Sequence, residues 1–175
     1  MKRIAVVLLF VLSVGMLATA QDATKASVFG GYQYFNIDTK DSGLGRQSAN
    51  GFNADLAIHA AKNFAIVADF GAAFKTVLGE KFRVYPILFG PRIVASSGKV
   101  TPFAEALFGF THISVSGVSE NKFTYAFGGG LDVDVHKNVA VRLAKFDYVG
   151  VRTGEAGIGT LNNFRLATGI VFKIK

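Results

Sequence analysis

The sequence has no cysteine and no tryptophan, and only 3 prolines in 175 residues. The missing cysteines exclude disulfide scaffolds, thiol catalysis, cysteine-ligated zinc and iron–sulfur clusters. With 50% hydrophobic and 18% charged residues, the composition also excludes a disordered chain. The formal net charge is +7, but the basic residues are scattered singly without a cluster. We therefore expect no nucleic-acid partner.

A long apolar run occurs at the start of the chain, and beyond residue 25 no stretch keeps a helical period. Lys2 and Arg3 precede an apolar stretch at 4–17 and a small-residue site at 18–20. This pattern is typical of a cleaved secretory signal, because the apolar stretch is short for a membrane span and polar residues follow it. We expect residues 1–20 to be removed, leaving one domain at 21–175.

Beyond residue 25, large apolar residues alternate with small or polar residues at every second position. Phe52, Leu56 and Ile58 alternate with Asn53 and Asp55, so a strand here has one large apolar face and one small or polar face. The same alternation recurs in the stretches 64–74, 123–135 and 163–174. With less regular runs included, about eight strands are expected, at 26–36, 50–60, 64–74, 82–94, 100–111, 123–135, 139–148 and 163–174.

The expected connections fall into two alternating classes. Tight turns are expected at 61–63, 96–99 and 136–138, and longer connections rich in Gly, Ser, Asn and Asp at 37–49, 75–81, 112–122 and 149–162. All short connections then lie at one end of an up-and-down antiparallel sheet and all long ones at the other. That asymmetry is typical of a transmembrane barrel with short periplasmic turns and long external loops. The predicted fold class is therefore an all-β transmembrane barrel.

The composition of the polar face favours a membrane barrel over a secreted soluble barrel that binds a ligand. This face carries Gly, Ala, Asn and single charges, which fit inside a narrow tube, whereas a strand face in bulk water usually carries Lys, Glu, Thr and Gln. Because an eight-stranded interior holds little more than side chains, we expect the bulky Phe, Tyr, Leu and Ile residues to point outward into lipid. The soluble barrel remains the second alternative.

Several segments make the chain similar to the small eight-stranded outer-membrane barrels of diderm bacteria, the OmpA-like barrel domains and opacity-type surface antigens. These segments are Phe29 to Tyr32, Phe89 to Arg92, Thr101 to Gly109, Phe127 to Asp132, Arg142 to Tyr148 and Thr168 to Phe172. The resemblance implies outer-membrane location, contact with outer-membrane lipid and lipopolysaccharide, and insertion by the barrel assembly machinery. It also implies a structural or surface-interaction role, with any external ligand bound by the four long connections.

Charged residues at inward positions are expected to form a paired network in the lumen. The candidates are Asp55, Asp69, Glu105, Asp132, Asp134, Arg142 and Arg165. An unpaired buried charge costs several kcal/mol, so pairing that closes the tube is favoured over a small-solute pore, which remains an alternative.

Two of the expected strands are irregular. Arg142 and Lys145 have opposite parity, so either a bulge intervenes or Lys145 and Asp147 lie in the external rim. Pro86 and Pro91 also predict an irregularity or bulge within 82–94.

One enzymatic alternative is a lipid A acyl hydrolase. His112 and Ser114 share a strand face at the external end, and Glu120 could orient the imidazole. Such a pair is common by chance, and no oxyanion-hole element is recognisable. The three histidines are far apart in sequence, so no metal site is expected. We expect no catalytic residue and no cofactor.

Overall fold

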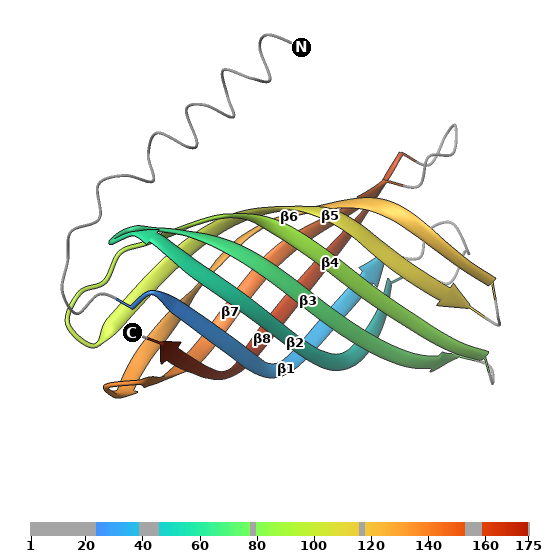
Figure 1. Ribbon diagram of the computed structural model, residues 1–175. Coiled ribbons are helices and arrows are strands. Elements are labelled where there is room, and N and C mark those ends of the chain that lie inside the picture. Colours follow the sequence, from blue (N-terminus) through green and yellow to red (C-terminus); the bar gives the residue numbers. More distant parts are fainter. Residues whose placement is uncertain (1–23, 39–45, 78–79, 116–117, 153–158, 175) are drawn as a thin grey trace, which may run out of the picture.

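The computed structural model describes residues 24–38, 46–77, 80–115, 118–152 and 159–174. Its strands are β1 (Ala26–Asp38), β2 (Arg46–Ala61), β3 (Phe64–Val77), β4 (Glu80–Val94), β5 (Val100–Val115), β6 (Val118–His136), β7 (Val139–Arg152) and β8 (Thr160–Ile174). They form a closed barrel in sequence order, with every neighbouring pair antiparallel and β8 pairing back to β1 (Figure 1). The predicted all-β up-and-down barrel is confirmed. In these stretches the chain forms no helix long and apolar enough to cross a membrane.

The three tight turns lie at one end of the barrel, together with the C-terminus and the entry to β1 (Figure 1). We call this the turn end and the opposite end the loop end. At the loop end the strands run further than predicted, into the segments 37–49, 75–81, 112–122 and 149–162, of which they include 37–38, 46–49, 75–77, 80–81, 112–115, 118–122, 149–152 and 160–162. The sequence did not reveal these extensions because the outward face loses its large apolar side chains there, whereas backbone pairing does not need an apolar outward face. Tyr34 Oη and Ser48 Oγ, for example, lie 2.6 Å apart in the extended β1–β2 ladder.

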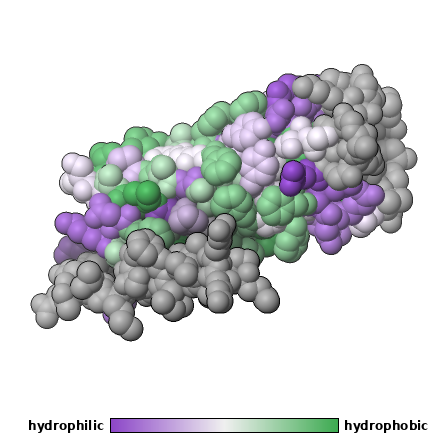
Figure 2. Space-filling view, turned by 90° about the horizontal axis from the view of Figure 1, so that it is seen from above, coloured by the Kyte–Doolittle hydropathy of each residue, from purple (hydrophilic) through white to green (hydrophobic). Residues whose placement is uncertain are grey.

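The outer wall consists of large apolar side chains at every second strand position. Phe52, Phe70, Phe89 and Phe127 are exposed there, and Figure 2 shows apolar side chains over much of the wall on the face it presents. Neighbouring strands bring these rings into contact, as in the edge-to-face pair Phe108–Phe127 with centroids 5.9 Å apart. Because the barrel is closed, no edge strand leaves a row of unpaired backbone groups.

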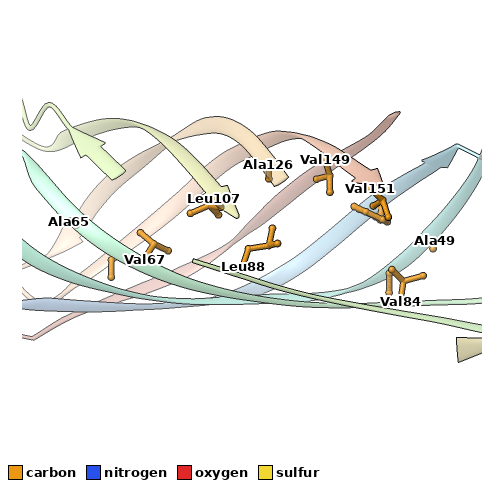
Figure 3. Packing of buried hydrophobic residues seen from close by; sticks show 12 residues of the cluster. Ala49, Ala65, Val67, Val84, Leu88, Leu107, Ala126, Val149 and Val151 are labelled. Carbon is orange, nitrogen blue, oxygen red and sulfur yellow. The ribbon is translucent and has the colours of Figure 1, made fainter. Parts of the chain in front are cut away.

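The expectation that every bulky side chain points outward was wrong. Phe29, Phe35, Leu88 and Leu107 are buried inside the barrel. Most of them belong to an apolar cluster in which valines and alanines from several strands meet (Figure 3). Small residues and charges alone would leave voids in the tube, and filled interiors are more stable than interiors with voids.

The irregularity in β7 is a bulge. Leu131 of β6 pairs with Ala144, whereas the next residue, Asp132, pairs with Arg142. The extra residue gives Arg142 and Lys145 the same inward direction, and both are fully buried. Lys145 and Asp147 therefore lie in the lumen and not in the external rim.

The two prolines of β4 do not produce a bulge. The register between β3 and β4 is the same before and after Pro86. Pro86 pairs with Thr111 of β5, and Pro91 pairs with Ile66 of β3, while each proline lacks a pairing on its other side. The strand tolerates each missing donor on one side because the ladder on the other side continues.

Candidate functional site: a charged cluster across the lumen

Nine charged side chains meet inside the barrel in what we call the lumen cluster. They come from seven strands and consist of Asp55, Asp69, Arg92, Glu105, Asp132, Arg142, Lys145, Asp147 and Arg165. All are buried. Their strands direct them inward by the two-residue period, with the β7 bulge correcting the phase for Lys145 and Asp147.

Lys145 lies at the centre of the lumen cluster. Its Nζ is 2.6 Å from Asp69 Oδ2 and 2.7 Å from Glu105 Oε1, and it approaches Asp55 Oδ2 at 3.7 Å. These acids come from β2, β3 and β5, whereas the lysine comes from β7 on the other side of the barrel. A single ammonium group therefore links β7 to three strands with which β7 does not pair.

Arg165 connects two further acids beside this centre. Its Nη1 donates to Asp69 Oδ1 at 2.6 Å, and its Nε donates to Asp147 Oδ2 at 2.8 Å. Asp69 thus accepts from both Lys145 and Arg165, one cation at each oxygen. Charge-assisted bonds of this kind are stronger than neutral hydrogen bonds.

Two arginines complete the lumen cluster on its turn-end side. Arg142 donates through Nε and Nη2 to the two oxygens of Asp132 at 2.7 and 3.0 Å, and through Nη1 to Asp55 at 2.6 Å. Arg92 binds the same Asp55 and, at 2.7 Å, Glu105. The ring of Phe103 contacts both arginines, with its centroid 4.5 Å from each guanidinium carbon, and Asp55 Oδ2 accepts from both. Cation–π attraction therefore stabilises both guanidinium groups.

An apolar layer adjoins the lumen cluster towards the loop end. Leu107 follows Glu105 by two positions on β5, and Val149 follows Asp147 by two positions on β7, both towards the loop end. With Val84 they belong to the buried apolar cluster of Figure 3. Towards the loop end the tube is thus filled by an apolar layer next to the charged one, and on the turn-end side Phe29, Ala140 and Val171 are buried as well.

The structure brings together six of the seven lumen residues named from the sequence. Asp134 lies apart, half-buried near the turn end, where it pairs with Lys173. Arg92, Lys145 and Asp147 were not in the predicted set. Arg92 shares its parity with the small inward residue Gly90, so alternation could have found it. Simple alternation could not assign Lys145 and Asp147, because the β7 bulge changes the inward parity between Arg142 and Lys145.

The arrangement suggested for lipid hydrolysis is not formed. His112 Nδ1 lies 2.9 Å from Asn121 Oδ1, and Glu120 pairs instead with Lys122 at 2.7 Å. Since Glu120 and Asn121 are consecutive on β6, their side chains leave opposite faces of the sheet. Glu120 therefore does not orient the His112 imidazole.

Comparison with known proteins places the fold among bacterial outer-membrane β-barrels. No protein-family model matches the sequence, and neither does any curated protein. Among solved structures, Neisserial surface protein A has a TM-score of 0.71 at 14% identity, covering 86% of this chain and 97% of that one. The outer membrane protein OprG of Pseudomonas aeruginosa has a TM-score of 0.60 at 10% identity, covering 89% and 99%. Ail of Yersinia pestis has 0.53 at 19%, covering 84% and 97%. The chain therefore has the fold of the small eight-stranded outer-membrane β-barrels.

Proposed function

We propose that this protein is an integral outer-membrane barrel of a diderm bacterium with a structural or surface-interaction role and a lumen closed to solutes. The observation that carries the proposal is the position of Lys145, which lies fully buried at the centre of the barrel between Asp69 and Glu105. Ion pairs that cross the lumen fill the path that a solute would need. The adjoining apolar layer around Leu107 and Val149 would exclude water from the same path.

The outer wall supports the membrane part of the proposal. Phe52, Phe89 and Phe127 present their rings outside, on strands whose other face is already packed. A soluble barrel would expose this whole apolar wall to water, and patches of that extent are rare on soluble monomers. In lipid the same wall is favourable, and closure satisfies the backbone groups. The soluble ligand-binding barrel is accordingly the weaker alternative.

The remaining parts of the proposal concern export and partners. Residues 1–20 would act as a cleaved secretory signal, the barrel assembly machinery would insert the domain 21–175, and lipopolysaccharide would contact the outer wall. An external ligand would bind at the loop end, in the segments 37–49, 75–81, 112–122 and 149–162. Ail of Yersinia pestis has been solved in complex with the heparin analogue sucrose octasulfate, so a protein of this fold can bind a ligand.

Fractionation tests the membrane location. We expect the protein in the outer-membrane fraction, released by detergent only, and with a gel mobility that shifts on heating because the closed barrel resists unfolding without heat. A freely soluble periplasmic protein without a heat shift would contradict the proposal and favour the soluble barrel.

Recording in planar bilayers tests the closed lumen. We expect no steady conductance for the wild type and increased conductance for Arg142→Ala and Arg165→Ala, because each change removes cationic bonds that cross the tube. Glu120→Gln is the matched control, since it breaks an exposed pair at the loop end. Only protein that shows the heat shift is recorded, so misfolded variants do not contribute. A steady wild-type channel of porin size would contradict the closed lumen and make solute passage the leading function.

A further inference from the structure

The turn end of the barrel carries a ring of lysines. Lys62, Lys99 and Lys137 each lie in one of the three tight turns, and Lys25 lies at the entry to β1 beside β8. All four are exposed, and within the stretches that the structure describes none of them forms an ion pair. With the strands in sequence order around the barrel, one lysine falls at every second strand. We call these four residues the lysine ring.

Among the residues that the structure describes, Asp134 is the one acid at this end outside the lumen cluster. Five acids are used in the lumen cluster, and Asp134 at the turn end is already paired with Lys173. The loop end differs, because there Glu120 and other acids accompany the basic residues, as in its pair with Lys122. Within the described residues, the positive charge of the lysine ring is therefore not compensated by acids at the turn end.

The lysine ring borders the apolar wall. Ile58 and Ile66 are paired and exposed on the hairpin that Lys62 closes. Val135, two residues before Lys137, is 63% exposed, and so is Ile93, which lies near the turn that contains Lys99. Lysine stems extend along apolar surface while their ammonium groups reach the polar interface. Once the apolar wall lies in hydrocarbon, these ammonium groups lie at the depth of lipid phosphates.

We infer that the lysine ring binds the phosphates of anionic phospholipids in the membrane leaflet that surrounds the turn end. The inference rests on the proposed membrane location. Headgroups surround the barrel on all sides, as the four lysines do. A linear anionic polymer would reach only part of a ring distributed over the whole circumference. Separate lipid molecules therefore fit the geometry better than one polymer.

Electron paramagnetic resonance of spin-labelled lipids tests the inference. The full barrel is reconstituted in phosphatidylcholine vesicles with a trace of labelled phosphatidylglycerol or labelled phosphatidylcholine, and the lipid immobilised at the barrel is measured. We expect labelled phosphatidylglycerol to be enriched by up to about five-fold at each lysine, the effect of one basic residue near an anionic surface. The enrichment should fall in 1 M salt, where the screening length decreases to about 3 Å.

Two matched variants identify the lysine ring as the cause. Replacing all four lysines by Gln should remove most of the enrichment, whereas replacing all four by Arg should keep it. Enrichment unchanged in the Gln variant would overturn the inference. The inference would also be overturned if the wild type bound peptidoglycan through these lysines while the lipid enrichment did not depend on them. Immobilised lipid without headgroup preference would also overturn it and leave the membrane barrel intact, whereas no immobilised lipid at all would instead contradict the membrane location.

Discussion

The outer wall and the lumen are formed by the two faces of the same strands, but their side chains need different surroundings. Leu56 is 42% exposed on the wall, whereas the preceding residue, Asp55, is 3% exposed and contacts three cations in the lumen. On the wall, any apolar side chain of suitable size would meet lipid. In the lumen, each charge depends on a particular partner at hydrogen-bonding distance. Wall residues therefore stabilise the barrel through the apolar area that they place in lipid, whereas lumen residues stabilise it through specific ion pairs. The same kind of substitution should change stability by different amounts on the two faces.

The largest effect is expected where the lumen loses its central cation. Lys145→Met leaves Asp69 and Glu105 without the ammonium group at 2.6 and 2.7 Å. Removing one partner of a buried pair costs about 3–5 kcal/mol, and we expect that loss in the free energy of unfolding in urea, measured in detergent micelles. Glu120→Gln, which removes the exposed carboxylate of a pair at the loop end, is the control. If both variants unfolded at the same urea concentration as the wild type, the lumen charges would contribute nothing to stability.

A charge placed on the wall should have the next largest effect. Leu56→Arg and Phe70→Arg put a guanidinium into lipid, on strands that carry the lumen cluster on their other face. Near the bilayer midplane this costs about 2–4 kcal/mol, measured by unfolding in phospholipid vesicles. The apolar exchanges Leu56→Phe and Phe70→Leu should change stability little. Normal folding of both Arg variants would contradict the contact of the wall with lipid and favour a soluble barrel.

Adding one methyl group compares the two faces most directly. A Cβ at Gly128 would lie 2.1 Å from Asp147 Oδ1 and 2.3 Å from the Phe146 carbonyl oxygen. A Cβ at Gly30, on the wall, would meet nothing within 4 Å. Gly128→Ala should therefore cost about 1–3 kcal/mol in the urea measurement, whereas Gly30→Ala should be close to neutral. Equal stability of the two variants would show that the lumen can rearrange around Asp147.

The smallest effect is expected for an ion pair outside both regions. Glu120→Gln breaks the contact with Lys122 Nζ at 2.7 Å, but the glutamate side chain is 60% exposed. Exposed pairs contribute about 0.2–1 kcal/mol or less, so the urea midpoint should hardly move. A loss as large as that of Lys145→Met would mean that exposure does not distinguish this pair from the lumen cluster.

Residue alternation was sufficient to predict the barrel and its wall. Phe52, Leu56 and Phe70 were assigned outward and Asp55 and Asp69 inward, and both faces agree with the structure. This worked because lipid imposes the same requirement on every outward position, so the period of two persists along the strand. Alternation failed at the loop end, where the outward face becomes polar and the strands continue.

The sequence by itself determined the strand order, the two faces of most strands and six members of the lumen cluster. Only the tertiary structure decided the position of Lys145 and Asp147, because the β7 bulge shifts the phase by one residue and depends on pairing with β6 and β8. It also decided which charges pair, since Lys145 meets Asp69 across the barrel, from strands distant in sequence. Partners of this kind are set by closure of the tube. Local sequence fixes the direction in which a side chain points, but closure decides what it meets.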